Sequence, residues 1–185
     1  MISSEPTIRI NVPTLLTLSR VFLIPFFLYV APDQPLLGAS IFVIASLTDF
    51  FDGYIARKKN SITKFGIILD PIADKFLTIS ALVLLVDLGR LSVWIAAVLI
   101  IRDFLVTGLR VVALSKGITI PAEMGGKLKT TFQFIGIVAL VSMPALGGEL
   151  LGFDLYDLGI ASIWTALVLS VVSGLKYTVS FWRKI

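Results

Sequence analysis

Four aspartates inside two long apolar segments constrain this chain more than any other feature of its sequence. They lie within the stretch DFFDGYIARKKNSITKFGIILDPIAD and are Asp49, Asp52, Asp70 and Asp74. An unpaired charge in the middle of a membrane-spanning helix costs at least about 2.5 kcal/mol. These carboxylates therefore require positive groups that compensate their charge.

The spacing of the aspartates predicts that they meet on a helical hairpin. Asp49 and Asp52 are three residues apart, and Asp70 and Asp74 are four apart, so each pair lies on one face of a helix. The polar segment from Lys58 to Lys64 is short, which predicts that the two helices are antiparallel neighbours. The two acidic pairs then lie at similar depths below the loop. A cluster with only oxygen ligands suits hard divalent cations, Mg²⁺ or Mn²⁺, and has enough carboxylates for two of them.

Small residues and one arginine between the aspartates predict contact with a ligand that contains phosphate. Gly53, Ala56 and Gly66 allow close packing of the helices, or contact between a ligand and the backbone. Arg57 ends the first helix at the water boundary, where its guanidinium can bind a phosphate. The alternative is a purely structural cluster of ion pairs. It is disfavoured because four acids face only this one arginine within the stretch.

The same residues resemble a known signature. D-x-x-D-G-x-x-A-R, then eight residues, then G-x-x-x-D-x-x-x-D, from Asp49 to Asp74, matches every fixed position of the CDP-alcohol phosphotransferase motif. The resemblance implies a metal-dependent phosphatidyltransferase and a homodimer. If two cations are present, Asp49 and Asp70 can bridge both, with Asp52 completing one site and Asp74 the other, which is also what the resemblance implies.

The resemblance further implies CDP-diacylglycerol as the donor substrate, with its cytidine against Gly53, Ala56 and Gly66. The hydroxyl of an acceptor attacks the β-phosphorus, and CMP leaves. The sequence contains no histidine, so the commonest general base is missing, and carboxylates, lysine or tyrosine must do any acid–base work near neutral pH. Asp74, at the edge of the cluster, is the base that we expect.

The composition predicts a membrane protein. The chain has 185 residues, of which 57% are hydrophobic, and a mean hydropathy of +0.97. These values are too apolar for a soluble domain and typical of a polytopic membrane protein. One domain over residues 1–185 is expected. The absence of cysteine excludes disulfides, thiolate nucleophiles and cysteine-ligated zinc.

Six apolar runs are long enough to cross a bilayer, so the expected fold is an all-α membrane protein, a six-transmembrane-helix bundle. The predicted spans are Leu15–Ala31, Leu36–Arg57, Phe65–Leu88, Ser92–Leu114, Leu128–Leu146 and Leu158–Val179. Ile8 to Leu18 mixes apolar and polar residues, which predicts an N-terminal interfacial segment or a plain entry into the first span. No cleavable signal peptide is expected.

The distribution of charge orients the predicted bundle. Lysines and arginines gather at the termini and at the loops on the side of Lys58 to Lys64, whereas the opposite loops are mainly acidic. By the positive-inside rule, both termini and the aspartate-bearing end face the cytoplasm, in a multi-pass protein of the cell (inner) membrane. The sequence pI near 9.5 requires no nucleic-acid partner, because a basic rim also favours anionic lipid.

Cationic residues in the fourth and fifth segments predict an anionic acceptor. Asp103, Thr107 and Arg110 share one face of a helix at i, i+4 and i+7, and Arg102 precedes them. Arg102 either contributes to this acceptor site or is simply neutralised by Asp103, whereas Arg110 and Thr107 are expected to bind substrate. Lys127 enters the fifth helix near the same rim. These segments resemble the bacterial phosphatidylglycerophosphate synthases, which implies that Lys127 binds the acceptor's phosphate and that the acceptor is glycerol 3-phosphate.

The predicted reaction therefore transfers the phosphatidyl group of CDP-diacylglycerol to glycerol 3-phosphate, giving phosphatidylglycerophosphate and CMP. Other acceptors of the same chemistry are inositol phosphate, serine and phosphatidylglycerol. A divalent-cation transporter is the alternative from a different class, because intramembrane aspartates also mark ion pathways. It is disfavoured because residues 41–46 and 81–86, the outer halves of the second and third segments, are almost wholly apolar.

Overall fold

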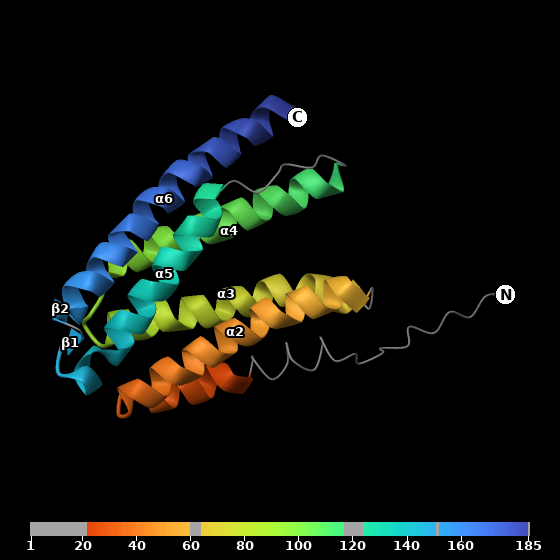
Figure 1. Ribbon diagram of the computed structural model, residues 1–185. Helices are drawn as coiled ribbons and strands as arrows, with labels where there is room; N and C mark the ends of the chain where they lie inside the picture. Colours follow the sequence, from red (N-terminus) through yellow and green to blue (C-terminus); the bar gives the residue numbers. More distant parts are fainter. Residues whose placement is uncertain (1–21, 60–63, 117–123, 151, 185) are drawn as a thin grey trace.

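The computed structural model describes residues 22–59, 64–116, 124–150 and 152–184, and the side chains of residues 49–74, 114, 153 and 184 lie outside this description. The described part contains six α-helices and one small β-hairpin (Figure 1). The elements are a helix over residues 22–30, α2 (Pro35–Lys59), α3 (Lys64–Asp87), α4 (Val93–Ser115), α5 (Met124–Ser142), the 3-10 helix η1 (Met143–Leu146), β1 (Glu149–Leu150), β2 (Phe153–Asp154) and α6 (Leu155–Lys184). The helical prediction is confirmed for this part of the chain.

The helices form two groups (Figure 1). The helix at 22–30 and the antiparallel pair of α2 and α3 lie side by side, and α4, α5 and α6 form the second group. Helix α5 packs mainly on α6 and also contacts α2 and α3. The two groups approach each other near η1 and diverge toward the C-terminal ends of α4 and α6. The basic ends of α2, α4 and α6 therefore lie on one side of the bundle, opposite the β-hairpin.

The core is apolar and joins both groups. The rings of Phe27 and Phe42 are 5.9 Å apart, and those of Phe42 and Phe134 are 5.6 Å apart, which links the first helix, α2 and α5. Helices α5 and α6 approach closely because Gly136 and Gly159 face each other's helix. A Cβ on Gly136 would lie 2.7 Å from the side chain of Ile163, so a larger residue there would push the helices apart.

Polar contacts fix the ends of the helices away from the aspartates. Arg90, in the connection from α3 to α4, donates from Nη1 to the backbone oxygens of Leu140 at 3.0 Å and Val141 at 3.3 Å, near the end of α5. These carbonyls are among those that an α-helix leaves without partners. Asp154 accepts hydrogen bonds from the backbone N–H groups of Tyr156 and Asp157, which starts α6.

The observed boundaries differ from the predicted spans at two helices. The fifth helix begins at Met124 rather than Leu128 and becomes a 3-10 helix at Met143. The sixth extends from Leu155 to Lys184 rather than from Leu158 to Val179. Hydropathy marks the apolar part of a helix, whereas its backbone hydrogen bonds continue into polar residues. The two-residue strands β1 and β2 were not part of the expected all-α fold.

Two helices in the described part are long and apolar enough to cross a membrane. They are Met124–Leu146 (α5 continued by η1) and Leu155–Arg183, and Pro35–Thr48 is a shorter apolar stretch of α2. Helix α4 has 23 residues but carries three charges. Large apolar side chains are nevertheless exposed on α4 and α6, among them Trp94, Ile101, Trp164, Leu175 and Trp182. Exposed apolar surfaces of this kind suit contact with lipid or with another protein.

Candidate functional site

The backbone of α2 and α3 places the four predicted metal ligands on neighbouring helices (Figure 1). Asp49 lies ten residues before the end of α2, and Asp74 lies ten residues after the start of α3. At 1.5 Å per residue, each is about 15 Å from the loop end of its helix. Asp52 and Asp70 are seven and six residues from the same ends. The two acidic pairs are therefore at matched levels along antiparallel helices.

Eight predicted site residues lie in the part of α2 and α3 whose side chains are outside the description. They are Asp49, Asp52, Gly53, Ala56, Arg57, Gly66, Asp70 and Asp74. Among the side chains that the structure does describe, no group of three or more acidic residues could hold a metal ion. The predicted metal site stays a prediction that rests on the sequence and on the backbone of the two helices.

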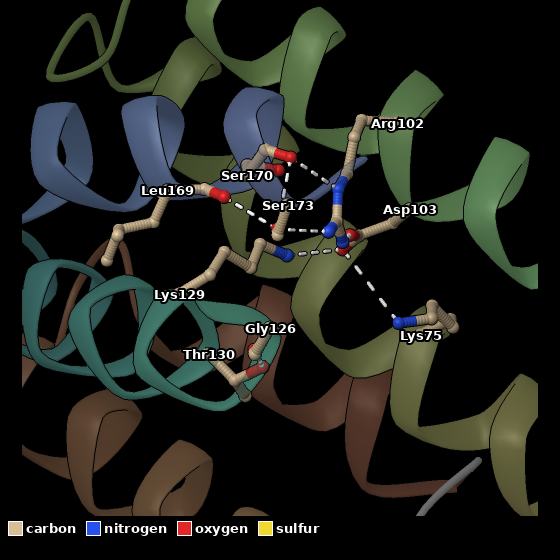
Figure 2. Close-up of polar contacts among 9 residues, drawn as sticks. All are labelled: Lys75, Arg102, Asp103, Gly126, Lys129, Thr130, Leu169, Ser170 and Ser173. Carbon is tan, nitrogen blue, oxygen red and sulfur yellow. Dashed lines mark hydrogen bonds and ion pairs between the residues drawn. The ribbon is translucent and has the colours of Figure 1, made fainter. Parts of the chain in front are cut away.

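A charged cluster lies beside α3, between α4 and α5 (Figure 2). It consists of Asp103 and three cations, Lys75, Arg102 and Lys129, and is called the Asp103 cluster below. Lys129 Nζ is 2.6 Å from Asp103 Oδ2, and Arg102 Nη1 is 3.2 Å from Asp103 Oδ1. Lys75 Nζ is 3.9 Å from Asp103 Oδ2. One carboxylate thus contacts cations from α3, α4 and α5.

Arg102 also joins α4 to α6. Its Nε donates to the backbone oxygen of Ser170 at 2.8 Å, and its Nη2 donates to Ser173 Oγ at 2.6 Å. Gly174 makes room for this side chain, since a Cβ there would lie 3.1 Å from Arg102 Nε. The guanidinium therefore has partners on α6 in addition to Asp103. This geometry agrees with the structural alternative, in which Asp103 neutralises Arg102, rather than with a guanidinium free to bind substrate.

The two lysines at the start of α5 point in different directions. Lys127, the predicted site residue, is exposed, whereas the side chain of Lys129 is only 5% exposed and faces Asp103. Residues two apart on a helix lie on nearly opposite faces. Lys129 shares its face with Gln133 and Gly136, which are also buried. The spacing i, i+4 and i+7 places these three residues on one face of α5, and the structure identifies that face as the buried one.

The remaining predicted residues of α4 lie closer to its C-terminal end. Thr107 is half-buried and Arg110 is exposed. The guanidinium carbon of Arg110 is 6.0 Å from the centre of the Tyr177 ring on α6, at the limit for a cation–π contact. Arg110 is thus held near α6 by a weak contact, and no residue in the described part of the chain accepts a hydrogen bond from its guanidinium.

Among the residues that the structure describes, three buried polar atoms on α5 and α6 have no hydrogen-bond partner. They are Gln133 Nε2, Ser170 Oγ and Tyr177 Oη. Buried polar groups are normally paired with protein, water or ligand. These three atoms lie on the same helices as Lys129 or beside Arg102 and Arg110. The interior between α4, α5 and α6 is therefore polar around these cations, in contrast to the apolar core near η1.

Comparison with known proteins connects these features to one family. The sequence profile of the CDP-alcohol phosphatidyltransferase family matches residues 10–172. The chain is 40% identical to a Bacillus subtilis (strain 168) protein named CDP-diacylglycerol–glycerol-3-phosphate 3-phosphatidyltransferase, over 94% of this chain and 96% of the relative. Proteins of the same name from Wigglesworthia glossinidia brevipalpis and Rickettsia bellii (strain RML369-C) are 34% and 37% identical, over 95% and 90% of this chain and 97% and 93% of those relatives.

Proposed function

Because the chain belongs to the CDP-alcohol phosphatidyltransferase family, we propose that it transfers the phosphatidyl group of CDP-diacylglycerol to glycerol 3-phosphate, releasing CMP. The observation that carries this proposal is the full set of eight signature residues, placed on the adjacent antiparallel helices α2 and α3. The choice of glycerol 3-phosphate as the acceptor is supported by the names of relatives that match nearly the whole chain.

Four carboxylates would hold two divalent cations, Mg²⁺ or Mn²⁺, in this proposal. The donor set fits such ions, because Asp49 and Asp52 of α2 and Asp70 and Asp74 of α3 supply hard oxygen ligands at matched levels of neighbouring helices. When bound, the cations offset the negative charge that develops on the leaving phosphate.

The chain's own residues bind the donor and move one proton. Arg57 binds the diphosphate of the donor, and Gly53, Ala56 and Gly66 leave room for its cytidine. Asp74 accepts the proton of the acceptor hydroxyl, whose oxygen forms a bond to the β-phosphorus. The bond between that phosphorus and the oxygen of the departing CMP breaks. A general base beside the attacking hydroxyl increases the reaction rate roughly 10²- to 10⁴-fold.

Surplus positive charge supports an acceptor that is itself anionic. The Asp103 cluster has three cations around one carboxylate, and Arg110 and Lys127 add exposed cations on α4 and α5. Glycerol 3-phosphate carries a phosphate that the exposed Arg110 and Lys127 can bind, whereas serine lacks one. Inositol phosphate and phosphatidylglycerol also carry phosphate, so they remain the acceptors to compare.

The proposal places the enzyme in the cell (inner) membrane, as a single domain with six spans. The exposed apolar side chains of α4 and α6 support contact with lipid, and the basic ends of α2, α4 and α6 on one side support a cytoplasmic orientation of that side (Figure 1). The donor's acyl chains can then stay in lipid while its diphosphate reaches the aspartates. A homodimer is proposed from the family resemblance alone.

Arg110→Ala is expected to raise the KM for glycerol 3-phosphate about 10- to 100-fold, because a charged hydrogen bond to phosphate contributes about 1.5–3 kcal/mol. The KM for CDP-diacylglycerol should change little. Tyr177→Phe keeps the ring beside Arg110 and is the matched control. Steady-state kinetics with each substrate varied in turn measure both constants, and equal effects on the two substrates would argue against an acceptor site at Arg110.

The proposed reaction is tested with purified protein in lipid nanodiscs. The protein is supplied with CDP-diacylglycerol, Mg²⁺ and one alcohol at a time: glycerol 3-phosphate, inositol phosphate, serine or phosphatidylglycerol. CMP release and the lipid product are measured. We expect rapid CMP release only with glycerol 3-phosphate. Faster release with another alcohol would replace the proposed acceptor, and no release with any of them would overturn the proposed function.

A further inference from the structure

Asp103 occupies an unusual position in the bundle. It is the only acidic side chain that is buried in the described part of the chain, and cations from three different helices lie within 4 Å of its carboxylate. A single carboxylate cannot neutralise three cations, so the Asp103 cluster carries surplus positive charge. Removing Asp103 would leave these cations to repel one another where little water screens them.

The three ion pairs of the Asp103 cluster differ in strength (Figure 2). Lys129 is buried and contacts the carboxylate at 2.6 Å, and Arg102 is fixed further by Ser170 and Ser173 of α6. Lys75 is 29% exposed, and its nitrogen is 3.9 Å from Asp103 Oδ2. The carboxylate is therefore held firmly by Lys129 of α5 and by Arg102, which α6 fixes in turn, whereas its contact with α3 is long and partly open to solvent.

The weaker contact connects the two groups of helices. Lys75 directly follows Asp74 on α3, and its ion pair with Asp103 is the only one in the described part that joins α3 to the group of α4, α5 and α6. Figure 1 shows these groups diverging toward the ends of α4 and α6. Lys75 and Asp103 each lie near the middle of their helix, so their ion pair links α3 to α4 in addition to the apolar packing of the bundle.

We propose that Asp103 is a positioning residue for the transfer reaction. Arg102 and Lys129 fix its carboxylate, and through Lys75 it sets the position of the aspartate-bearing half of α3 relative to α4, α5 and α6. In this way, the donor-binding residues on α2 and α3 keep a fixed position relative to the acceptor-binding cations on α4 and α5. The catalytic part of this inference rests on the proposed function, whereas the positional part does not.

The absence of cysteine from the chain allows the positional part to be measured directly. Phe76 on α3 and Leu175 on α6 are exposed, so both can be replaced by Cys and labelled with nitroxide spin labels. Pulsed electron–electron double resonance on the protein in nanodiscs then gives the distance distribution between the two labels. Val83 and Leu158, exposed positions nearer η1, form the control pair.

Asp103→Asn and Lys75→Met are expected to broaden or lengthen the distribution for the pair at 76 and 175, with the pair at 83 and 158 unchanged. Asp103→Glu keeps the charge and should stay close to the original distribution. Lys75→Met serves as the second variant, because a partly exposed lysine can be replaced with little loss of stability. A distribution that is unchanged in both charge-removing variants would overturn the inference.

Kinetics separate positioning from a general effect on folding. Lys75→Met should lower kcat at least about tenfold, since small misplacement of reacting groups costs rate steeply, while the KM for CDP-diacylglycerol changes less than about twofold. Asp103→Glu should recover most of the kcat that Asp103→Asn loses. A normal kcat in Lys75→Met, with an altered distance, would overturn the catalytic part. If the wild-type protein releases no CMP, the proposed function is refuted. The distance measurement would still test whether Asp103 and Lys75 set the position of α3.

Discussion

Asp74→Asn is expected to bind CDP-diacylglycerol normally and to turn it over at least about 100-fold more slowly, because the acceptor hydroxyl loses its general base. The substitution is isosteric, so donor binding should be retained. The measurements are kcat at saturating substrates and equilibrium binding of the donor in nanodiscs. Asp157→Asn is the matched control, since Asp157 is an exposed aspartate in the first turn of α6, remote from the aspartates of α2 and α3.

The same variant distinguishes a lost base from a weakened metal site. Raising the Mn²⁺ concentration should restore turnover if Asp74 acts only as a ligand, because a weaker site is then filled again. It should restore little if Asp74 accepts the proton. Near-normal rates in Asp74→Asn at ordinary Mg²⁺ concentrations would end the assignment of Asp74 as the base.

Asp103→Asn is expected to destabilise the protein by about 3–5 kcal/mol, the usual cost of removing one partner from a buried ion pair. Lys129 would remain buried and Arg102 partly buried next to a neutral amide, and their mutual repulsion would no longer be offset. For a chain of this length, each kcal/mol lowers Tm by about 2–4 °C. Thermal unfolding of the detergent-solubilised protein, followed by circular dichroism, measures the loss.

A double variant tests the electrostatic cause of that loss. Asp103→Asn combined with Lys129→Met removes both members of the shortest ion pair and should recover part of the stability, because an apolar replacement of a buried pair is often tolerated. Asp87→Asn, at an exposed aspartate, should change stability by no more than about 0.5 kcal/mol. If Asp103→Asn unfolds at the same temperature as Asp87→Asn, the Asp103 cluster does not stabilise the bundle.

The helices could be predicted from the sequence because long apolar runs are interrupted by strong turn signals. The second predicted segment, Leu36–Arg57, differs from α2 by one or two residues at each end. The start of α6 at Leu155, three residues before the predicted run, depends on Asp154, whose side chain accepts hydrogen bonds from the backbone N–H groups of Tyr156 and Asp157. Hydropathy alone carries no information about such a cap.

The candidate site was only partly predictable. The aspartates could be assigned because their spacing is fixed by the geometry of single helices and by a specific signature. The role of Lys129 was missed because Lys127 and Lys129 are equally basic, and the choice between them depends on which face of α5 meets α4. Likewise, the sequence left open whether Arg102 binds substrate or is neutralised by Asp103, and only the contacts of Arg102 with Ser170 and Ser173 of α6 distinguish these roles.

Binding of Mn²⁺ to the purified protein tests most directly whether α2 and α3 hold cations jointly. Electron paramagnetic resonance counts free Mn²⁺ as the metal is titrated, without requiring turnover. We expect two ions per chain, with both affinities reduced when one helix is changed by Asp49→Asn and when the other is changed by Asp70→Asn. Binding that survives either substitution unchanged, or binding that is absent from the unchanged protein with donor present, would contradict the shared site.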